Sequence, residues 1–540
     1  MADYDVVLVG SGINSLACAA LLARGGWRVC VLERNDWLGG AIKTAEITEP
    51  GFRHDVFSAW HPLWVGGAAH TQLGEELAAR GLEYLNTELP TGAAFPDGAA
   101  AFLVRDADGN AAELGEEWRG VLDRFLPNAD LAFSVLGTEL WGRGGPALAL
   151  KASRRLGRRG FARFAGELVQ SSRDWLTTTF ASERAHGVLA PWVLHTGLGP
   201  DDAASGFMTQ VIAVAVQEGG IPVPRGGGAQ LVDALVQLIT DHGGAAETGR
   251  DVERVLVEAG RAVGVRTTEG DTVTADRAVV CDVTPTQLYA RLLADADVPA
   301  EVAEGARRFR YGRAEMQIHF ALSEPPRWEG DDRLGRTAIV HVTPGLDGVS
   351  RAVNEAVRGL LPAEATIVVG QPLTLDPSRA PEGAGMLWIQ LQELPWRVKG
   401  DAAGELDVGE GTWTERLRER YANRIQARLA RHIPNLESSI MRRTVLSPAD
   451  LQAANINLRQ GDPYGGALSL DQNFLWRPFG ASPGHATPIG RLYHIGASTW
   501  PGPGLGAGSG TIVAEELLRP PASERALAKL RALVGRAATD

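Results

Sequence analysis

Two glycines and one glutamate near the N-terminus have the types and spacing of a dinucleotide-binding site. Gly10 and Gly12 are separated by one serine, and Glu33 follows about twenty residues later. Glycines let the backbone turn tightly and approach a pyrophosphate, and a carboxylate after the next strand can accept hydrogen bonds from both hydroxyls of an adenosine ribose. Ser15 replaces the third glycine of the usual pattern and is small enough for close helix packing. A 2′-phosphate would be repelled by Glu33.

The elements that must position these residues form a strand, a turn, a helix and a second strand. Residues 6–9 and 27–32 are short apolar runs suited to buried parallel strands, and 16–24 is alanine-rich with high helix propensity. The first N–H groups of that helix would face the phosphates. A chain with 65 glycines contains such strings by chance, and an ordinary strand–helix–strand unit is the alternative. The acid that ends the second strand favours the dinucleotide.

Composition and charge limit the classes of function. A chain of 540 residues is too long for one core, and a net charge of −12 argues against nucleic-acid binding, which needs a basic surface. Cys18, Cys30 and Cys281 form no CxxC pair, which favours a reducing cytoplasm and excludes a disulfide reductase. The 11 histidines show no HExxH or HxH spacing, so we predict no metal site.

The sequence also predicts where the protein resides. It has no basic region before its first apolar strand and no window of eighteen consecutive apolar residues, so we expect no secretory signal and no spanning helix. Residues 151–164 are basic with interleaved apolar positions, which predicts peripheral contact with an anionic membrane; a solvated helix face is the alternative. The cluster contains Lys151, Arg154, Arg155, Arg158, Arg159 and Arg163, with Leu156, Phe161 and Phe164 between them.

Changes in the pattern of elements along the chain predict two interleaved domains. Helical periods dominate 90–224, while 286–440 mixes helices with strands such as 314–322 and 386–394. The C-terminal part returns to an apolar strand, a loop of small residues and a helix near Thr511. We predict one domain from residues 1–89, 225–285 and 441–540, and a substrate domain from 90–224 and 286–440.

The motifs at the two ends of the chain resemble one known family. The stretches GSGINSLACAALLARGG, VLERNDWLGGAIKTAE and LYHIGASTWPGPGLGAGSG are similar to the bacterial phytoene-desaturase-like branch of the flavin amine oxidase superfamily. The resemblance covers the chain from end to end, and the paired motifs are more specific than either alone. It implies an α/β fold with a Rossmann-like FAD-binding domain, of glutathione-reductase type and amine-oxidase-like, and an interleaved α+β substrate domain.

The resemblance implies non-covalent FAD, because the C-terminal loop has no cysteine for a covalent link. It places the adenine end at Gly10, Gly12 and Glu33, the backbone of Val252 at the adenine edge, and the flavin near the C-terminal motif. For Lys43 a surface lysine is the alternative. The implied FAD-binding residues are Gly10, Gly12, Ile13, Asn14, Ser15, Glu33, Arg34, Gly39, Gly40, Ala41, Lys43, Ser58, Val252, Gly496, Ala497, Gly506, Ala507 and Ser509.

Residues 52–61 correspond to the stretch that crosses the flavin in relatives, so Trp60 and His61 become candidates for the catalytic pocket. The familiar C-terminal histidine is replaced here by Trp500, which is a third candidate. A histidine before a proline is also common as a loop residue with a satisfied hydrogen bond, which is the alternative for His61.

The leading hypothesis is an FAD-dependent dehydrogenase, desaturase or oxidase that takes hydride from a largely apolar small molecule, such as an isoprenoid or carotenoid-like substrate. A second hypothesis is an amine oxidase with Trp60 and Trp500 forming an aromatic cage. A third is a non-enzymatic, prenyl-protein escort-like binding protein; the intact Glu33 and the small-residue C-terminal loop argue against it. The sequence leaves the electron acceptor and the direction of reaction open.

Overall fold

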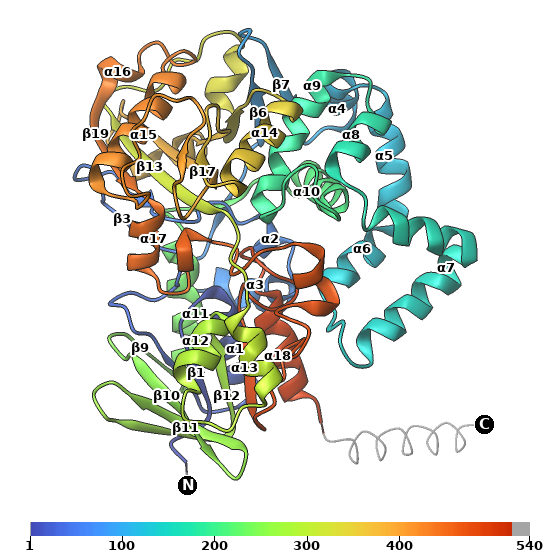
Figure 1. Cartoon of the computed structure of the whole chain (residues 1–540), viewed down its shortest axis with the longest axis vertical. Helices are drawn as coiled ribbons and strands as arrows, with labels where there is room; N and C mark the ends of the chain where they lie inside the picture. The colour runs from blue at the N-terminus through green and yellow to red at the C-terminus, as the bar shows by residue number, and fades with distance from the viewer. Residues whose placement is uncertain (1, 521–540) are drawn as a thin grey trace.

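The computed structural model describes residues 2–520, which form two large sheets with helices packed around them (Figure 1). The last twenty residues of the predicted 441–540 segment lie outside the described residues. The first sheet is drawn with β1, β10, β11 and β12 in the lower half of the figure. The second, with β13, β17 and β19, lies in the upper half.

The first sheet is built from three distant parts of the chain. Five of its strands are parallel, and β10 and β11 continue it beyond β12 as an antiparallel meander. Its strands are β9 (Ala245–Glu247), β2 (Val29–Leu32), β1 (Tyr4–Val9), β12 (Thr272–Asp282), β11 (Arg261–Thr267), β10 (Val252–Glu258) and β20 (Leu492–Ile495), the last of which pairs with β12.

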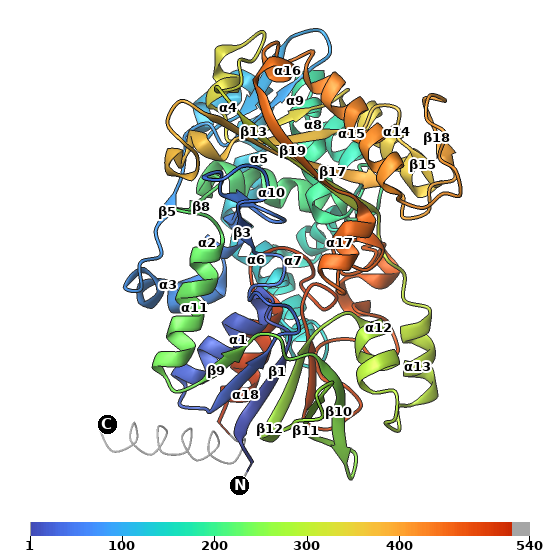
Figure 2. The ribbon, with the colours of Figure 1, turned by 90° about the vertical axis from the view of Figure 1, so that its left-hand side faces the viewer.

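Helices cover both faces of this sheet because its central strands are apolar on both sides. Val6 and Leu8 point toward one set of helices, and Val7 and Val9 toward the other. Figure 2 shows the two sets on opposite sides of the sheet. The first set is α1 (Ile13–Arg24), α3 (Ala68–Ala78), α11 (Ala229–Asp241) and α18 (Gly508–Leu518); the second includes α12 (Pro285–Gln287) and α13 (Ala300–Arg307).

One face of the second sheet packs against its own covering helix, and the other packs partly against the helices within 107–219 and partly lines the cavity described below. Residues such as Met316 and Leu391 belong to the enclosed core, while their neighbours alternate to the opposite face. Its strands, in spatial order, are β19 (Ile440–Leu446), β13 (Ala314–Leu322), β17 (Gly385–Leu394), β16 (Ile367–Gly370), β14 (Ile339–Val342), β6 (Thr91–Ala94) and β7 (Ala100–Leu103). The main covering helix is α15 (Glu415–Leu429).

A helical layer follows β7, as the pattern of 90–224 predicts. Its long helix α7 contains a break at Gly157, whose φ of 67° and ψ of 172° are not helical. In Figure 1, α6 and α7 project from the side of the molecule. The layer consists of α4 (Ala107–Leu114), α5 (Glu117–Phe125), α6 (Ala129–Leu136), α7 (Gly144–Glu167), α8 (Ser172–Thr179), α9 (Glu183–Leu189), the 3₁₀ helix Ala190–Thr196 and α10 (Ser205–Gly219).

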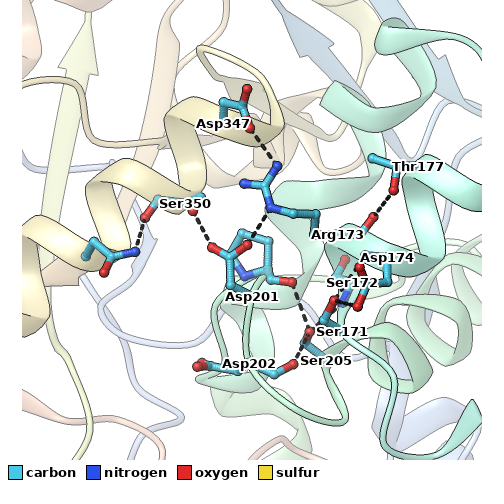
Figure 3. Close-up of polar contacts among 12 residues, drawn as sticks. Ser171, Ser172, Arg173, Asp174, Thr177, Asp201, Asp202, Ser205, Asp347 and Ser350 are labelled. Carbon is cyan, nitrogen blue, oxygen red and sulfur yellow. Dashed lines mark hydrogen bonds and ion pairs between the residues drawn. The ribbon is translucent and has the colours of Figure 1, made fainter. Parts of the chain in front are cut away.

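A polar network ties this layer to α14 (Leu346–Val357), as Figure 3 shows. The guanidinium of Arg173 donates to Asp201 at 2.5 Å and to Asp347 at 2.6 Å. Ser350 also donates to Asp201. These residues come from three separated segments, so the network fixes the helical layer against the second sheet's own helix.

Two features of the segments differ from the sequence predictions. The nominally helical 90–224 segment begins with β6 and β7, which pair into the second sheet. The 441–540 segment, predicted to belong to the first domain, begins inside β19 of the second sheet. β6 pairs with the distant β14, and β19 pairs with the distant β13, and local patterns do not reveal such pairing.

Candidate functional site

A large cavity lies between the two sheets. Its walls come from the carboxyl ends of β1, β2 and β12 on one side and from β13 and β17 on the other. It holds about 2230 Å³ of space between atoms, its open mouth included. Carboxyl ends of parallel strands are where α/β sheets bind ligands, so the first sheet presents its expected binding edge to this space.

The glycine turn is shaped for close approach of a backbone-bound ligand. Gly10 has a φ of +89°, which disfavours other residues. A Cβ on Gly12 would lie 2.6 Å from Oδ2 of Asp282, and one on Gly40 would lie 3.1 Å from the Cα of Gly12. Gly12 is also the residue from which α1 begins. Without side chains here, the N–H groups of Ile13 and Asn14 at the start of α1 remain available to phosphate oxygens, while that of Ser15 donates to Asp282.

Glu33 ends β2 with its carboxylate held in place at the cavity wall. Its Oε2 accepts from the backbone N–H of Ser11 at 2.9 Å and from the Ser11 hydroxyl at 2.8 Å, and its Oε1 accepts from the N–H of Asn35 at 2.9 Å. A carboxylate has about four lone-pair directions, so acceptor capacity remains for a ribose. The carboxylate is thereby oriented before any ligand arrives.

Asp282 is a site residue that the sequence analysis missed. It ends β12 and faces the cavity beside Gly12, with its Oδ2 accepting from the N–H of Ser15 at 3.2 Å. Burial, and to a smaller extent the charge of Glu33, raises the pKa of Asp282 to about 6. Its place at the end of a parallel strand is the signal that would have found it.

Val252 lies at the cavity where the adenine edge is expected. Its carbonyl accepts a hydrogen bond of 2.7 Å from Arg291, which also donates to Asp251 at 2.5 Å. Arg34 lines the same end, 3.7 Å from Asp251. One lone pair of the Val252 carbonyl is therefore already used, and its backbone can offer the other.

The predicted binding residues divide into two groups. The cavity is lined by Gly10, Gly12, Ile13, Asn14, Glu33, Arg34, Gly39, Gly40, Ala41, Ser58, Trp60, Val252 and Ala497. A second group does not line the cavity: Ser15, Lys43, Gly496, Gly506, Ala507, Ser509, His61 and Trp500. Gly496 donates to the hydroxyl of Ser509 at 3.1 Å, and Lys43 lies 3.6 Å over the ring of Trp37.

Two of the predicted pocket residues, His61 and Trp500, are not among the residues that line the cavity. His61 begins the short helix α2 (Pro62–Val65), and its enclosed ring bonds to the hydroxyl of Tyr84 at 3.0 Å. The indole N–H of Trp500 donates to the carbonyl of Val135 on α6 at 3.0 Å. Only one ring nitrogen of His61 is bonded, because its Nε2 is buried without a hydrogen-bond partner among residues 2–520. Trp60 alone of the three lines the cavity.

The second-sheet wall combines aromatic and polar residues. Trp60, Trp192 and Trp388 line it together with aliphatic residues of α10. Four further lining residues are polar: Glu315, Gln317, Gln390 and Gln392.

Glu315 is the centre of that polar group. Its Oε1 accepts from the amides of Gln317 and Gln390, the latter at 2.7 Å. Burial raises the pKa of Glu315 to about 8, so the carboxyl is largely neutral at pH 7. The sequence signal was the alternation of polar residues along both strands, which brings Gln317 opposite Gln390.

No metal centre or membrane span emerges from the described chain. Residues 2–520 contain no group of three or more His, Cys, Asp or Glu side chains that could hold a metal ion. None of their helices is long and apolar enough to cross a membrane.

Comparison with known proteins decides the family. Residues 16–435 match the family described as flavin containing amine oxidoreductase. The chain belongs to this flavin amine oxidoreductase family. It falls in the phytoene desaturase-like branch, and it is an enzyme, an FAD-dependent oxidoreductase. The cradle of glycines around Gly12 and the oriented Glu33 fit the adenine half of FAD.

Two curated relatives match this family member over almost their whole length. The zeta-carotene-forming phytoene desaturase of Myxococcus xanthus is 26% identical, covering 93% of this chain and 90% of its own. One of the subunits of limonene dehydrogenase from Castellaniella defragrans is 23% identical, covering 94% and 93%. A triple mutant of putrescine oxidase, redesigned in its cofactor binding, shares the fold with a TM-score of 0.60 at 16% identity, covering 95% and 98%.

Proposed function

We propose that this FAD-dependent oxidoreductase oxidises a largely apolar small molecule, with an isoprenoid as the first candidate. The observation that carries the proposal is the continuity of the cavity from the glycine turn to the tryptophan and aliphatic wall of the second domain. FAD held non-covalently at the glycine turn would supply hydride-accepting chemistry. The chain's own residues bind the dinucleotide, orient the substrate and keep water away from it.

The names of the relatives support this substrate class. Phytoene and limonene are apolar, and the lining tryptophans and the aliphatic residues of α10 suit such molecules. The neutral carboxyl of Glu315 is compatible with an apolar wall because its charge is suppressed by burial.

Amine oxidation is the second candidate, favoured by one observation. Trp60, Trp192 and Trp388 line the same wall as Glu315; aromatic faces can hold an ammonium group, whose charge would in turn favour the ionised form of the Glu315 carboxyl. Trp500, predicted as part of an aromatic cage, lies outside this wall.

The test starts with the absorption spectrum of the purified protein, which should show flavin bands that acid releases. Anaerobic titration then compares limonene with cyclohexylamine as donors to the flavin. Bleaching by the terpene supports the proposed function, and bleaching by the amine alone supports the second candidate. A colourless protein that cannot be reconstituted with FAD would contradict both.

We also propose that α7 brings the protein from the cytoplasm to an anionic membrane surface. Asp130 lies 3.2 Å from Lys151 and 2.6 Å from Arg155, so the charges of these two are compensated. Arg154, Arg158, Arg159 and Arg163 are exposed and form no ion pair within residues 2–520. Large apolar side chains lie exposed nearby in the chain: Phe133, Trp141 and Leu150. This combination suits an interfacial contact.

A further inference from the structure

His195 lies on the cavity wall between a tryptophan and a second histidine. It belongs to the 3₁₀ helix Ala190–Thr196, and its ring stacks on Trp192 with 4.7 Å between centroids. Its Nε2 lies 3.1 Å from the Nε2 of His341, a fully buried residue on β14. The pair thus joins the helical layer to the second sheet.

The contact between two Nε2 atoms restricts where the protons lie. One Nε2 must carry a proton and the other must accept it. If His195 donated, a neutral His341 would carry its proton on Nδ1, which is buried and has no acceptor within residues 2–520. If His341 donates, that buried Nδ1 is only an unused lone pair. Buried N–H groups without acceptors are rarer than under-used acceptors, so His341 is the donor.

With His341 as the donor, the tautomer of His195 is determined. Burial lowers the pKa of His195 to about 4 and that of His341 well below its usual value, so each ring carries one proton near pH 7. With its Nε2 accepting, His195 carries that proton on Nδ1. This atom makes no hydrogen bond to residues 2–520, and it is not among the enclosed atoms, in contrast to the Nδ1 of His341.

We propose that His341 holds His195 as the Nδ1–H tautomer, and that this N–H donates a hydrogen bond across the cavity wall to an acceptor atom of the substrate. The inference narrows the proposed apolar substrate to one that also carries an oxygen or nitrogen lone pair, such as a carbonyl or a neutral amine; a hydrocarbon such as limonene would occupy the cavity without this hydrogen bond. The inference rests on the proposed function in one respect, the use of this end of the cavity as the substrate site.

The tautomer is measurable without substrate by nitrogen-15 NMR of protein labelled at histidine. His494 serves as an internal standard, because its Nε2 lies 2.7 Å from the carbonyl of Val283, which can only accept. His195→Phe and His341→Phe assign the two signals by their loss. We expect the Nδ1–H pattern for His195 and the Nε2–H pattern for His341 and His494. An Nε2–H pattern for His195 overturns the proposal.

Calorimetric binding to the flavin-loaded protein tests the ligand. Cyclohexanone and methylenecyclohexane have nearly the same shape, and only the ketone accepts a hydrogen bond. His195→Phe should weaken cyclohexanone binding by about 3- to 10-fold and change methylenecyclohexane binding by less than about 2-fold. His242→Phe, a change at an exposed histidine, is the matched control and should alter neither. Equal losses for both probes would overturn the proposal.

The two measurements keep the inference separate from the proposed function. A protein that does not bind FAD would contradict the proposed function. The tautomer of His195 can still be measured by NMR in the same sample. Melting temperature and flavin content show whether His195→Phe folds. If that variant does not fold, the assignment relies on His341→Phe and the wild-type tautomer decides the outcome.

Discussion

At the scale of single residues, Glu33 carries the most direct prediction. Glu33→Ala removes a charged acceptor for ribose hydroxyls, worth about 1.5–3 kcal/mol, and should weaken FAD binding by roughly 10- to 100-fold. Flavin fluorescence during reconstitution of the apoprotein measures the dissociation constant. Glu258→Ala, a change at the exposed end of β10, is the control. Equal affinities in the two variants would contradict the assignment of Glu33.

Asp282 gives a prediction with a pH dependence. Because burial raises its pKa to about 6, the carboxyl is mostly neutral at pH 5 and charged at pH 7.5, beside the turn expected to hold a pyrophosphate. FAD affinity should therefore fall as pH rises through 6, and Asp282→Asn should remove this fall and bind FAD roughly 5-fold more tightly at pH 7.5. Titrations at both pH values check this, with exposed Asp297→Asn as control. A pH profile shared by all three proteins would argue against the charge effect.

Glu315 supplies a third residue-scale prediction. A folded-state pKa of about 8 lies above the ordinary value of 4.5, so the folded protein holds this proton more tightly than the unfolded chain does. The contribution of the Glu315 carboxyl to the free energy of unfolding is fully present below about pH 4.5 and is lost as the pH rises toward 8. Glu315→Gln, which stays neutral, should flatten the decline in melting temperature between pH 6 and pH 9. Exposed Glu258→Gln should leave the decline as it is in the wild type.

Residues whose partners are local could be predicted from sequence, and those with distant partners could not. The glycines and Glu33 act within one strand–helix–strand unit. Asp282 contacts Ser15 from 267 positions away, and Glu315 bonds to Gln390 from 75 positions away. Only the tertiary structure shows that the rings of His61 and Trp500 bond to Tyr84 and to the carbonyl of Val135 and do not line the cavity.

At the scale of elements, the start of α1 is the most sensitive point. Gly12 has an ordinary φ of −59°, so Gly12→Ala adds a steric clash with Asp282 without backbone strain. We expect the variant to lose most of its bound flavin, measured as absorbance at 450 nm per protein. Gly166→Ala is the matched control, since nothing lies within 4 Å of the added Cβ in α7. Full flavin content in Gly12→Ala would show that the turn has room to shift.

The helices and strands that could be predicted from sequence are those with a clear local hydrophobic pattern. The strand predicted at 314–322 coincides with β13, and the strand at 386–394 differs from β17 by one residue. β6 and β7 were missed because TGAA and AAFL carry little strand preference, and they form by pairing with each other and with β14. The role of the polar side of β13 and β17 became visible only with the cavity that it lines.

At the scale of the whole molecule, the projecting α7 leads to a membrane prediction. The wild-type protein should sediment with vesicles of phosphatidylcholine containing phosphatidylglycerol, and less so as salt rises. Changing Arg154, Arg158, Arg159 and Arg163 to glutamine should remove most of this binding. The same number of changes at exposed arginines distant in sequence, Arg307, Arg308, Arg327 and Arg416, is the control. Equal sedimentation of both quadruple variants would contradict a role for α7.

The interleaving of the first sheet has a consequence for biosynthesis. The glycine turn at Gly10 is made about 500 residues before β20 and α18, which complete its domain and end at Ile495 and Leu518. At about 5–20 residues per second, roughly 25 to 100 seconds separate these events. The nascent N-terminal unit must therefore stay unaggregated, and without its final strand, until β20 and α18 have been made. Loading of the cofactor follows the synthesis of these two elements.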